Sequence, residues 1–430
     1  MIDLNDTLYF SSVNFNGLQN RFWQETYEST SPGGKFFIDI ARRLNPNRFV
    51  TRDNSEWTLP WPQEMIPKYQ MVSYDPDFGQ TFAEVSDAKA LDFKRRINEH
   101  NERFAIMYSG GIDSTVIMTA LLKNLTAKEL KNIVVCTSVP AIVENPQFWH
   151  KYIWDKFHVI DSMIFKYHDL IEQGLTPVTA DDGDCIHGTV FGLNLYHNWE
   201  ALVGPRLSDT SRSHIASIMP SFGDPNVHYS EFKDLLITYM AYPANQKFPI
   251  VGVEEPDPNF GRRLYDKFAR NADTATVPVN SLHDFFWWLI FNVKMLNCGV
   301  RGALYYNDRI APKQAIHAIE NWYLDAGYQR WSMVNNNNGE KIGHSAATYK
   351  KTARDYIWSF DRNDWYRSFK LKLESMALNT VRQSIDESVF PKPATRFGIN
   401  KNYEFLDIKD PTVENYIRHH LDNYKIDWSE

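Results

Sequence analysis

The chain has 430 residues, which is long enough for two or three domains with separate hydrophobic cores. Hydrophobic residues make up 43% and charged residues 23%, and the formal net charge of −7 gives no overall attraction to nucleic acid or to an anionic membrane. The three cysteines, Cys136, Cys185 and Cys298, form no C-x-x-C pair, which argues against a zinc site or a disulfide framework.

The N-terminus is acidic and has no apolar core of a signal peptide, and no apolar run reaches the length of a membrane span. We therefore expect a cytoplasmic protein. Residues 1–95 carry the weakest pattern. We expect them to form a small N-terminal α/β cap or decoration that ends in a helix over 82–99.

The strongest pattern is a strand, a tight turn and a helix. The apolar run 103–107 predicts a buried parallel strand, and 114–123 has the length and apolar density of a helix. The turn between them contains Ser109, Gly110, Gly111, Ile112, Asp113 and Ser114. Glycines let backbone N–H groups approach a phosphate, and a helix N-terminus favours an anion. Asp113 and Ser114 are expected as N-cap residues. An ordinary capped turn is the alternative, and the strand–turn–helix context favours the phosphate site.

From 96 to 200 strands and helices alternate, which predicts an α/β domain with a doubly wound parallel sheet. Further strands are expected at 132–137, 158–164 and 176–180, with helices at 145–157 and 168–173. Ser138 and Val139 follow the second strand, where nucleotide bases bind in such sheets.

Residues 201–430 are expected to form a mostly helical part that completes the substrate site. Its candidate helices are 230–243, 259–271, 281–297, 312–326, 346–359 and 363–387.

An acidic cluster follows the strand at 176–180. It consists of Asp181, Asp182, Gly183 and Asp184. Three carboxylates beside a phosphate loop would repel one another and ATP unless a cation lay between them, and Mg²⁺ prefers oxygen ligands. The alternative is an acidic turn that caps a helix beginning at Cys185. The expected position at the same sheet edge as the first turn favours a magnesium site.

The run Ser109–Ser114 resembles the pyrophosphate loop of the N-type ATP pyrophosphatases, the PP-loop superfamily with an adenine nucleotide alpha hydrolase-like sheet. The run 179–188 is similar to the second motif of the asparagine synthetases. By that resemblance Asp181 takes the place of the acidic residue beside the reacting centre, and Asp184 that of the metal-binding aspartate. Cys185 stands where the family usually has glutamate.

Weaker matches follow in the family's order. Residues 306–311 resemble an Asp-Arg-Met-Ser segment of the family, and residues 322–325 resemble a Pro-Phe-Leu-Asp segment. Residues 349–354 resemble a Lys-x-x-x-Arg helix, and residues 390–398 resemble the loop with the catalytic lysine. In the last segment the lysine is Lys392. For Lys350 and Lys351 a solvated surface position is the favoured interpretation.

The resemblance implies an ATP-dependent ligase that adenylates a small-molecule carboxylate, releases pyrophosphate and forms an amide with ammonia or an amine. The loop Ser109–Ser114, with Asp182 and Gly183, would hold the nucleotide. Asp113 and Asp184 would bind Mg²⁺ between the phosphates. Lys392 would offset developing charge, and Asp181 would act as a base.

Glutamine-dependent asparagine synthetases begin with a glutaminase domain whose cysteine follows the initiator methionine, whereas this chain has Ile2 and no cysteine before Cys136. Free ammonia, a separate glutaminase partner or another amine is therefore the expected nitrogen source. Two alternatives stay open: another N-type ATP pyrophosphatase acting on tRNA or a small molecule, and a non-catalytic nucleotide-binding homologue.

Overall fold

The computed structural model describes residues 52, 69–154, 156–161, 167–188, 190–241, 258–295, 298, 312–336 and 350–369. The expected N-terminal cap before residue 69, apart from Arg52, and the loop with Lys392 lie outside these residues. The chain divides into two compact units, each built from separate segments. The sheet unit comprises 79–183, 306–328 and 345–430, and the helical unit comprises 1–78, 184–305 and 329–344. The domain boundaries at 95 and 200 stay a prediction.

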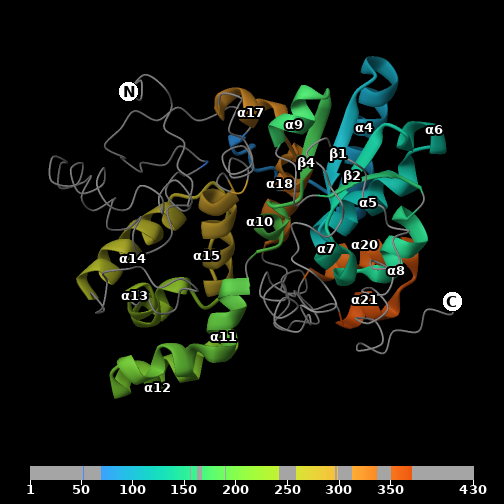
Figure 1. The fold of residues 1–430 in the computed structure, drawn as a ribbon. Coiled ribbons are helices and arrows are strands. Elements are labelled where there is room, and N and C mark those ends of the chain that lie inside the picture. Colours follow the sequence, from blue (N-terminus) through green and yellow to red (C-terminus); the bar gives the residue numbers. More distant parts are fainter. Residues whose placement is uncertain are drawn as a thin grey trace, which may run out of the picture. The chain divides into compact units, whose positions relative to one another are not determined.

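The sheet unit contains a sheet of five parallel strands in the order β3-β2-β1-β4-β5, which confirms the predicted α/β class. Figure 1 labels the central strands β1, β2 and β4. The strands are β1 (Arg103–Met107), β2 (Ile133–Thr137), β3 (His158–Asp161), β4 (Leu175–Thr179) and β5 (Glu320–Asn321). In the central strand, Phe104 is in register with Ile133 on one side and with Thr176 on the other.

The order of the strands reverses beside β1. The chain runs outward from β1 through β2 and β3, and then returns to the other side of β1 as β4. In open α/β sheets ligands bind outside the carboxyl ends of the strands at such a reversal. Both predicted motifs follow these strands, since the Ser/Gly turn comes after β1 and the acidic cluster after β4.

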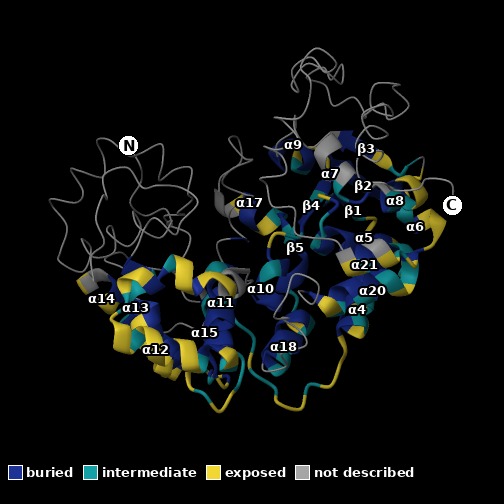
Figure 2. Cartoon of the chain, turned by 90° about the horizontal axis from the view of Figure 1, so that it is seen from below, coloured by how far each residue is buried: buried dark blue, intermediate teal, exposed yellow. Residues whose placement is uncertain are grey.

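Helices cover the sheet and bury its central strands. Figure 2 shows β1, β2 and β4 mostly in dark blue, and Phe104, Ala105 and Ile106 of β1 are fully buried. Helices α4, α5 and α20 pack against one another, and α9 packs against β4 and α17. Among the described residues, the helices that lie wholly in this unit are α4 (Phe82–His100), α5 (Ile112–Asn124), α6 (Ala127–Leu130), α7 (Val139–Glu144), α8 (Pro146–Phe148), α9 (Tyr167–Glu172), α17 (Pro312–Ala318), α20 (Lys351–Asp361) and α21 (Asp364–Phe369), with a π-helical turn at Trp149–Ile153 and a 3₁₀ turn at Trp322–Leu324. The expected helix at 82–99 is therefore present as α4, which begins with a capping box between Thr81 and Glu84.

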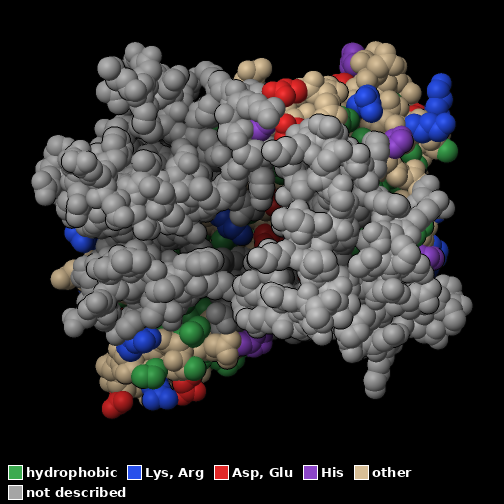
Figure 3. Space-filling view, in the orientation of Figure 1, with side chains coloured by type: hydrophobic (Ala, Val, Ile, Leu, Met, Phe, Trp, Pro, Cys, Tyr) green, Lys and Arg blue, Asp and Glu red, His purple; other side chains and the backbone are tan. Residues whose placement is uncertain are grey.

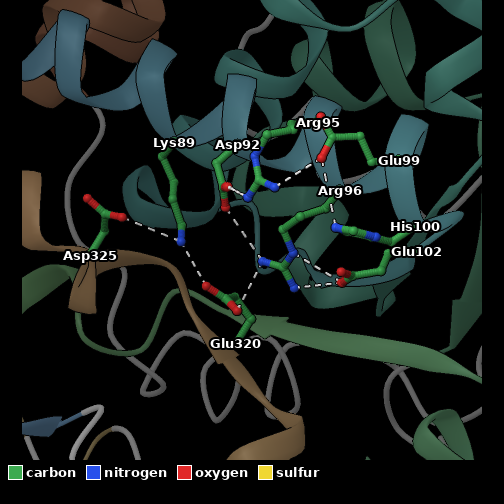
Figure 4. A network of polar contacts seen from close by, with 9 residues as sticks. All are labelled: Lys89, Asp92, Arg95, Arg96, Glu99, His100, Glu102, Glu320 and Asp325. Atoms are coloured by element: carbon green, nitrogen blue, oxygen red, sulfur yellow. Dashed lines mark hydrogen bonds and ion pairs between the residues drawn. The ribbon is translucent and has the colours of Figure 1, made fainter.

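The short strand β5 is attached to α4 by charged side chains (Figure 4). The ammonium of Lys89 lies 2.8 Å from a carboxylate oxygen of Glu320, and the guanidinium of Arg96 lies 3.3 Å from the other. The side chain of Lys89 is only 7% exposed, so its contact with Glu320 is shielded from solvent. These ion pairs hold the edge of the sheet, and with it the segment that follows β5, against α4.

The described part of the helical unit contains no strand. Its main helices are α11 (Val190–Leu202), α12 (Asp209–Ile218), α13 (Lys233–Ala241), α14 (Pro258–Asp273) and α15 (Leu282–Trp288), continued by a π-helical segment at Leu289–Lys294. Two helices cross between the units along the chain, α10 (Gly183–His187) and α18 (Ala326–Asn335). Acidic and basic side chains lie side by side over α12 in the space-filling view (Figure 3).

One buried arginine, Arg52, links separate segments of the helical unit. The side chain of Arg52 donates to the carbonyl of Tyr69 at 2.8 Å and to that of Phe291 at 2.9 Å, and its guanidinium lies over the Phe291 ring. Its charge is thus distributed over backbone acceptors and an aromatic face.

None of the described helices is both long and apolar enough to cross a membrane.

Candidate functional site

The Ser/Gly turn is a tight loop that only glycine allows at its centre. Gly110 has φ of +68°, and a Cβ atom added there would lie 2.0 Å from the carbonyl oxygen of Ala141 in α7. A side chain would therefore be excluded both by the left-handed backbone and by α7. Glycine is required at position 110 because the loop lies in contact with the backbone of Ala141.

Two serine hydroxyls close the loop on itself. The backbone N–H of Ser109 donates to Oγ of Ser114 at 3.1 Å, and Ser114 Oγ donates to the carbonyl of Gly111 at 3.2 Å. The two Oγ atoms lie 3.0 Å apart. Ser109 is exposed, whereas Ser114 is buried. The contact between the two hydroxyls therefore links the exposed Ser109 to the buried Ser114 across the loop.

The start of α5 differs from the prediction. The helix begins at Ile112 with Gly111 as its N-cap, so Asp113 and Ser114 lie in the first turn and are not N-cap residues. The extended conformation of Gly111 ends the loop earlier than the acidic and hydroxyl residues suggested. Asp113 still places a negative charge in the first turn, where it interacts favourably with the positive end of the helix dipole.

The acidic cluster meets the loop at Asp113. Asp181 is exposed, Asp182 and Gly183 are buried, and the N–H of Gly183 donates to the carbonyl of Ala180 at 3.0 Å. A Cβ atom at Gly183 would lie 2.5 Å from Cγ of Asp113. The two motifs that the sequence predicts at one sheet edge are therefore in contact, and glycine at 183 makes this approach possible.

A buried lysine neutralises Asp113. The ammonium of Lys350 donates to both carboxylate oxygens of Asp113, at 2.6 Å for Oδ1, with the Lys350 side chain 3% exposed and that of Asp113 21% exposed. The expectation that Lys350 is a solvated surface residue is wrong. Because its partner Asp113 lies 237 positions away in the sequence, no local sequence pattern predicts that Lys350 is buried.

The backbone at Lys350 is also unusual. Its φ of 55° and ψ of 36° are left-handed, a conformation that costs a residue with a side chain roughly 1–2 kcal/mol. Such conformations persist where the surrounding structure requires them. Its neighbour Lys351 behaves as predicted for a surface residue, since its side chain is 50% exposed and pairs with Asp355 one turn along α20.

Two buried tyrosines, which the sequence reasoning did not identify as site residues, contact the loop from the C-terminal half. Tyr323 donates its hydroxyl to the carbonyl of Asp113 at 2.8 Å. Tyr366 donates to the carbonyl of Gly110, 3.1 Å away, and its hydroxyl lies 3.2 Å from Thr115 Oγ1. Burial raises the pKa of both hydroxyls well above the ordinary value of 10.0, so both remain protonated donors at neutral pH. Tyr323 lies in the segment 322–325 that resembles a family motif, but no sequence signal identified Tyr366.

Asp184 and Cys185 belong to the helical unit. Asp184 is half-buried, and one of its carboxylate oxygens lies 3.9 Å from the ammonium of Lys294. Cys185 and Cys298 are both buried free thiols. Burial, together with a hydrogen bond to Cys298, raises the pKa of Cys185 well above its ordinary value. A protonated, enclosed thiol fits a packing role at this position.

The remaining predicted residues are placed as follows. Ser138 is half-buried at the carboxyl end of β2, and Val139 is the first residue of α7. Lys392 lies outside the described residues. Within the described residues, no group of three or more His, Cys, Asp or Glu side chains is arranged to hold a metal ion. The geometry thus unites Asp113 and Gly183 with Lys350 and the two tyrosines.

Comparison of the chain with protein-family models, with curated proteins and with solved structures found no match.

Proposed function

We propose that the protein is an ATP-dependent amide-forming ligase of the asparagine synthetase-like branch of the PP-loop superfamily. It would adenylate a carboxylate, release pyrophosphate and pass the acyl group to ammonia or an amine. The observation that carries this proposal is the contact between Gly183 and Asp113. It brings a glycine-rich loop and an acidic turn together where the strand order reverses.

The loop is suited to holding the β- and γ-phosphates of ATP. The first amides of a helix have no acceptors inside that helix, and the dipole at this end favours an anion. At the start of α5 these amides lie next to the exposed Ser109 and the half-buried Gly111. The hydroxyls of Ser109 and Ser114 would add two further donors or acceptors. The base would lie towards Ser138 and Val139.

The donor atoms of the acidic cluster fit Mg²⁺. This ion keeps several waters and uses one or two carboxylates together with substrate phosphates, so a preformed cage of protein ligands is not required. Asp113 would supply one carboxylate, and Asp184 stays the predicted second ligand. Bound Mg²⁺ would neutralise charge on the phosphates. Asp181, which is exposed, would accept a proton from the attacking amine.

Lys350 provides a second source of positive charge at the loop. Its ammonium is already desolvated and aimed at Asp113, which lowers the reorganisation needed when a phosphate arrives. We assign Lys350 the task of balancing the charge of Asp113 before the nucleotide binds and that of the pyrophosphate afterwards. Lys392 remains the predicted residue for the second half of the reaction.

The test is ATP–pyrophosphate exchange measured with a panel of carboxylic acids. The proposal predicts exchange with at least one acid, and its loss in Asp113→Ala and in Asp184→Ala. Asp209→Ala is the matched control, because Asp209 is an exposed aspartate in the first turn of α12. Exchange that survives in Asp113→Ala would contradict the assigned metal ligand. A protein that exchanges with no acid would contradict the ligase.

Two observations favour a second candidate, a nucleotide-binding homologue without chemistry. The charge of Asp113 is balanced by Lys350, and cysteine occupies position 185, where the family usually has glutamate. Binding of ATP, measured by calorimetry, together with no exchange would support this candidate. The tRNA-acting alternative gains no support from α12, where charges of both signs are mixed.

A further inference from the structure

Peptide geometry links the two tyrosines to the direction of the loop amides. In a trans peptide the C=O of one residue and the N–H of the next point in opposite directions. A hydroxyl that holds the carbonyl of Gly110 therefore turns the N–H of Gly111 away from Tyr366. In the same way, Tyr323 on the carbonyl of Asp113 turns the N–H of Ser114 away from Tyr323.

The far side of the loop is the side that an anion would reach. The N–H of Gly111 points towards the exposed Ser109, whose Oγ lies 3.3 Å away. Both tyrosines lie on the buried side, where Tyr323 is fully buried and Tyr366 is 1% exposed. The carbonyl of Gly110 is thus satisfied from the interior, and the amide of Gly111 is directed outward.

We propose that Tyr323 and Tyr366 form a tyrosine brace, a pair of positioning residues that hold the phosphate loop in its anion-binding conformation. The brace rests on the proposed function in that the anion is the pyrophosphate part of ATP. Neither hydroxyl is expected to touch the nucleotide. Each acts through a backbone carbonyl of the loop.

The two contacts come from separate elements. Tyr323 lies in the 3₁₀ turn after β5, and β5 is held against α4 by the ion pairs of Glu320. Tyr366 lies in α21. The loop that follows β1 is therefore fixed from two points in the second half of the chain. Failure of one tyrosine variant to fold would leave the other available for the test.

The experiment compares Tyr323→Phe and Tyr366→Phe with a matched control, Tyr229→Phe. Tyr229 is also buried, and its hydroxyl donates to the carbonyl of Ala269 at 3.2 Å and to Asp273 within the helical unit, not to the loop. Losing one net hydrogen bond changes an equilibrium by roughly two- to twelve-fold. Amide hydrogen exchange over 109–115 in the free protein is expected to become about five-fold faster in the two brace variants. It should be unchanged in the control, although all three variants lose some thermal stability.

The second measurement is the binding of ATP with Mg²⁺ and of inorganic pyrophosphate, by calorimetry. Each brace variant is expected to bind about five-fold more weakly than the unmodified protein, and the control to bind equally well. Unchanged amide hydrogen exchange in both brace variants, or an equal effect in Tyr229→Phe, would overturn the brace. The proposed function would stand in that case if the unmodified protein still catalysed ATP–pyrophosphate exchange. If the unmodified protein bound neither ligand, the proposed function would fail, and the assigned role of the brace would fail with it.

Discussion

Replacement of Lys350 by methionine is the sharpest perturbation of the site. Methionine keeps the unbranched apolar stem but removes the ammonium, so Asp113 loses the cation that contacts both of its oxygens. Breaking a buried ion pair on one side costs roughly 3–5 kcal/mol. Since the Asp113 side chain remains 21% exposed and can recruit water, we expect the lower end, about 3 kcal/mol, in the free energy of unfolding.

The adjacent lysine is a natural control for this experiment. Lys351 pairs with Asp355 on the surface of α20, with side chains 50% and 33% exposed. Lys351→Met should therefore cost only about 0.5 kcal/mol, and 1 M salt should remove most of that cost. The cost of Lys350→Met should depend little on salt.

The assay is urea unfolding at pH 7, followed by tryptophan fluorescence, in a double-mutant cycle with Asp113→Asn. Removing both charges leaves no buried ion unpaired, so the double variant should recover about 2 kcal/mol relative to the sum of the single variants. Additive effects, or a cost for Lys350→Met no larger than that for Lys351→Met, would refute the assigned burial and pairing of Lys350.

Two further predictions concern the surroundings of the loop. Burial raises the pKa of Asp361 from 3.8 to about 6, so the contribution of this group to the free energy of unfolding should fall as pH rises from about 4 to 6. Asp361→Asn should remove this dependence and add roughly 3 kcal/mol to the free energy of unfolding at pH 7. Urea unfolding across that pH range measures both effects. Gly110→Ala should cost several times more than Gly174→Ala in melting experiments. Both glycines are left-handed, but only a Cβ at 110 meets Ala141; equal costs would show that the loop can move away from α7.

The sequence was informative where neighbours along the chain determine the structure. The apolar run 103–107 became β1 with the predicted bounds, because a buried parallel strand needs a continuous apolar segment. The glycines at 110 and 183 were predicted only as nucleotide-binding residues, and the structure adds that each permits a close approach, Gly110 to Ala141 and Gly183 to Asp113. The N-cap of α5 was predicted at Asp113 and Ser114, whereas it is Gly111. All three residue types are common at helix starts, so the sequence does not distinguish between them.

The sequence was silent or misleading where the structure depends on distant partners. The expected helix over 312–326 is wrong beyond Ala318, where α17 ends and β5 follows. Strand β5 has two residues, too few to show any alternation, and it exists because Glu320 and Asn321 pair with the end of β4. The burial of Lys350 and the contact of Tyr366 with Gly110 join positions more than 200 residues apart. Only the folded chain reveals that a lysine and two tyrosines surround the loop.

A crystal structure with Mg²⁺ and an ATP analogue that resists cleavage between the α- and β-phosphates would test the proposed site most directly. We predict that the β- and γ-phosphates lie within hydrogen-bond distance of the amides of 110–114, with Asp113 beside the metal ion. A nucleotide bound elsewhere, or a loop left without phosphate at saturating concentrations of the analogue, would contradict this prediction.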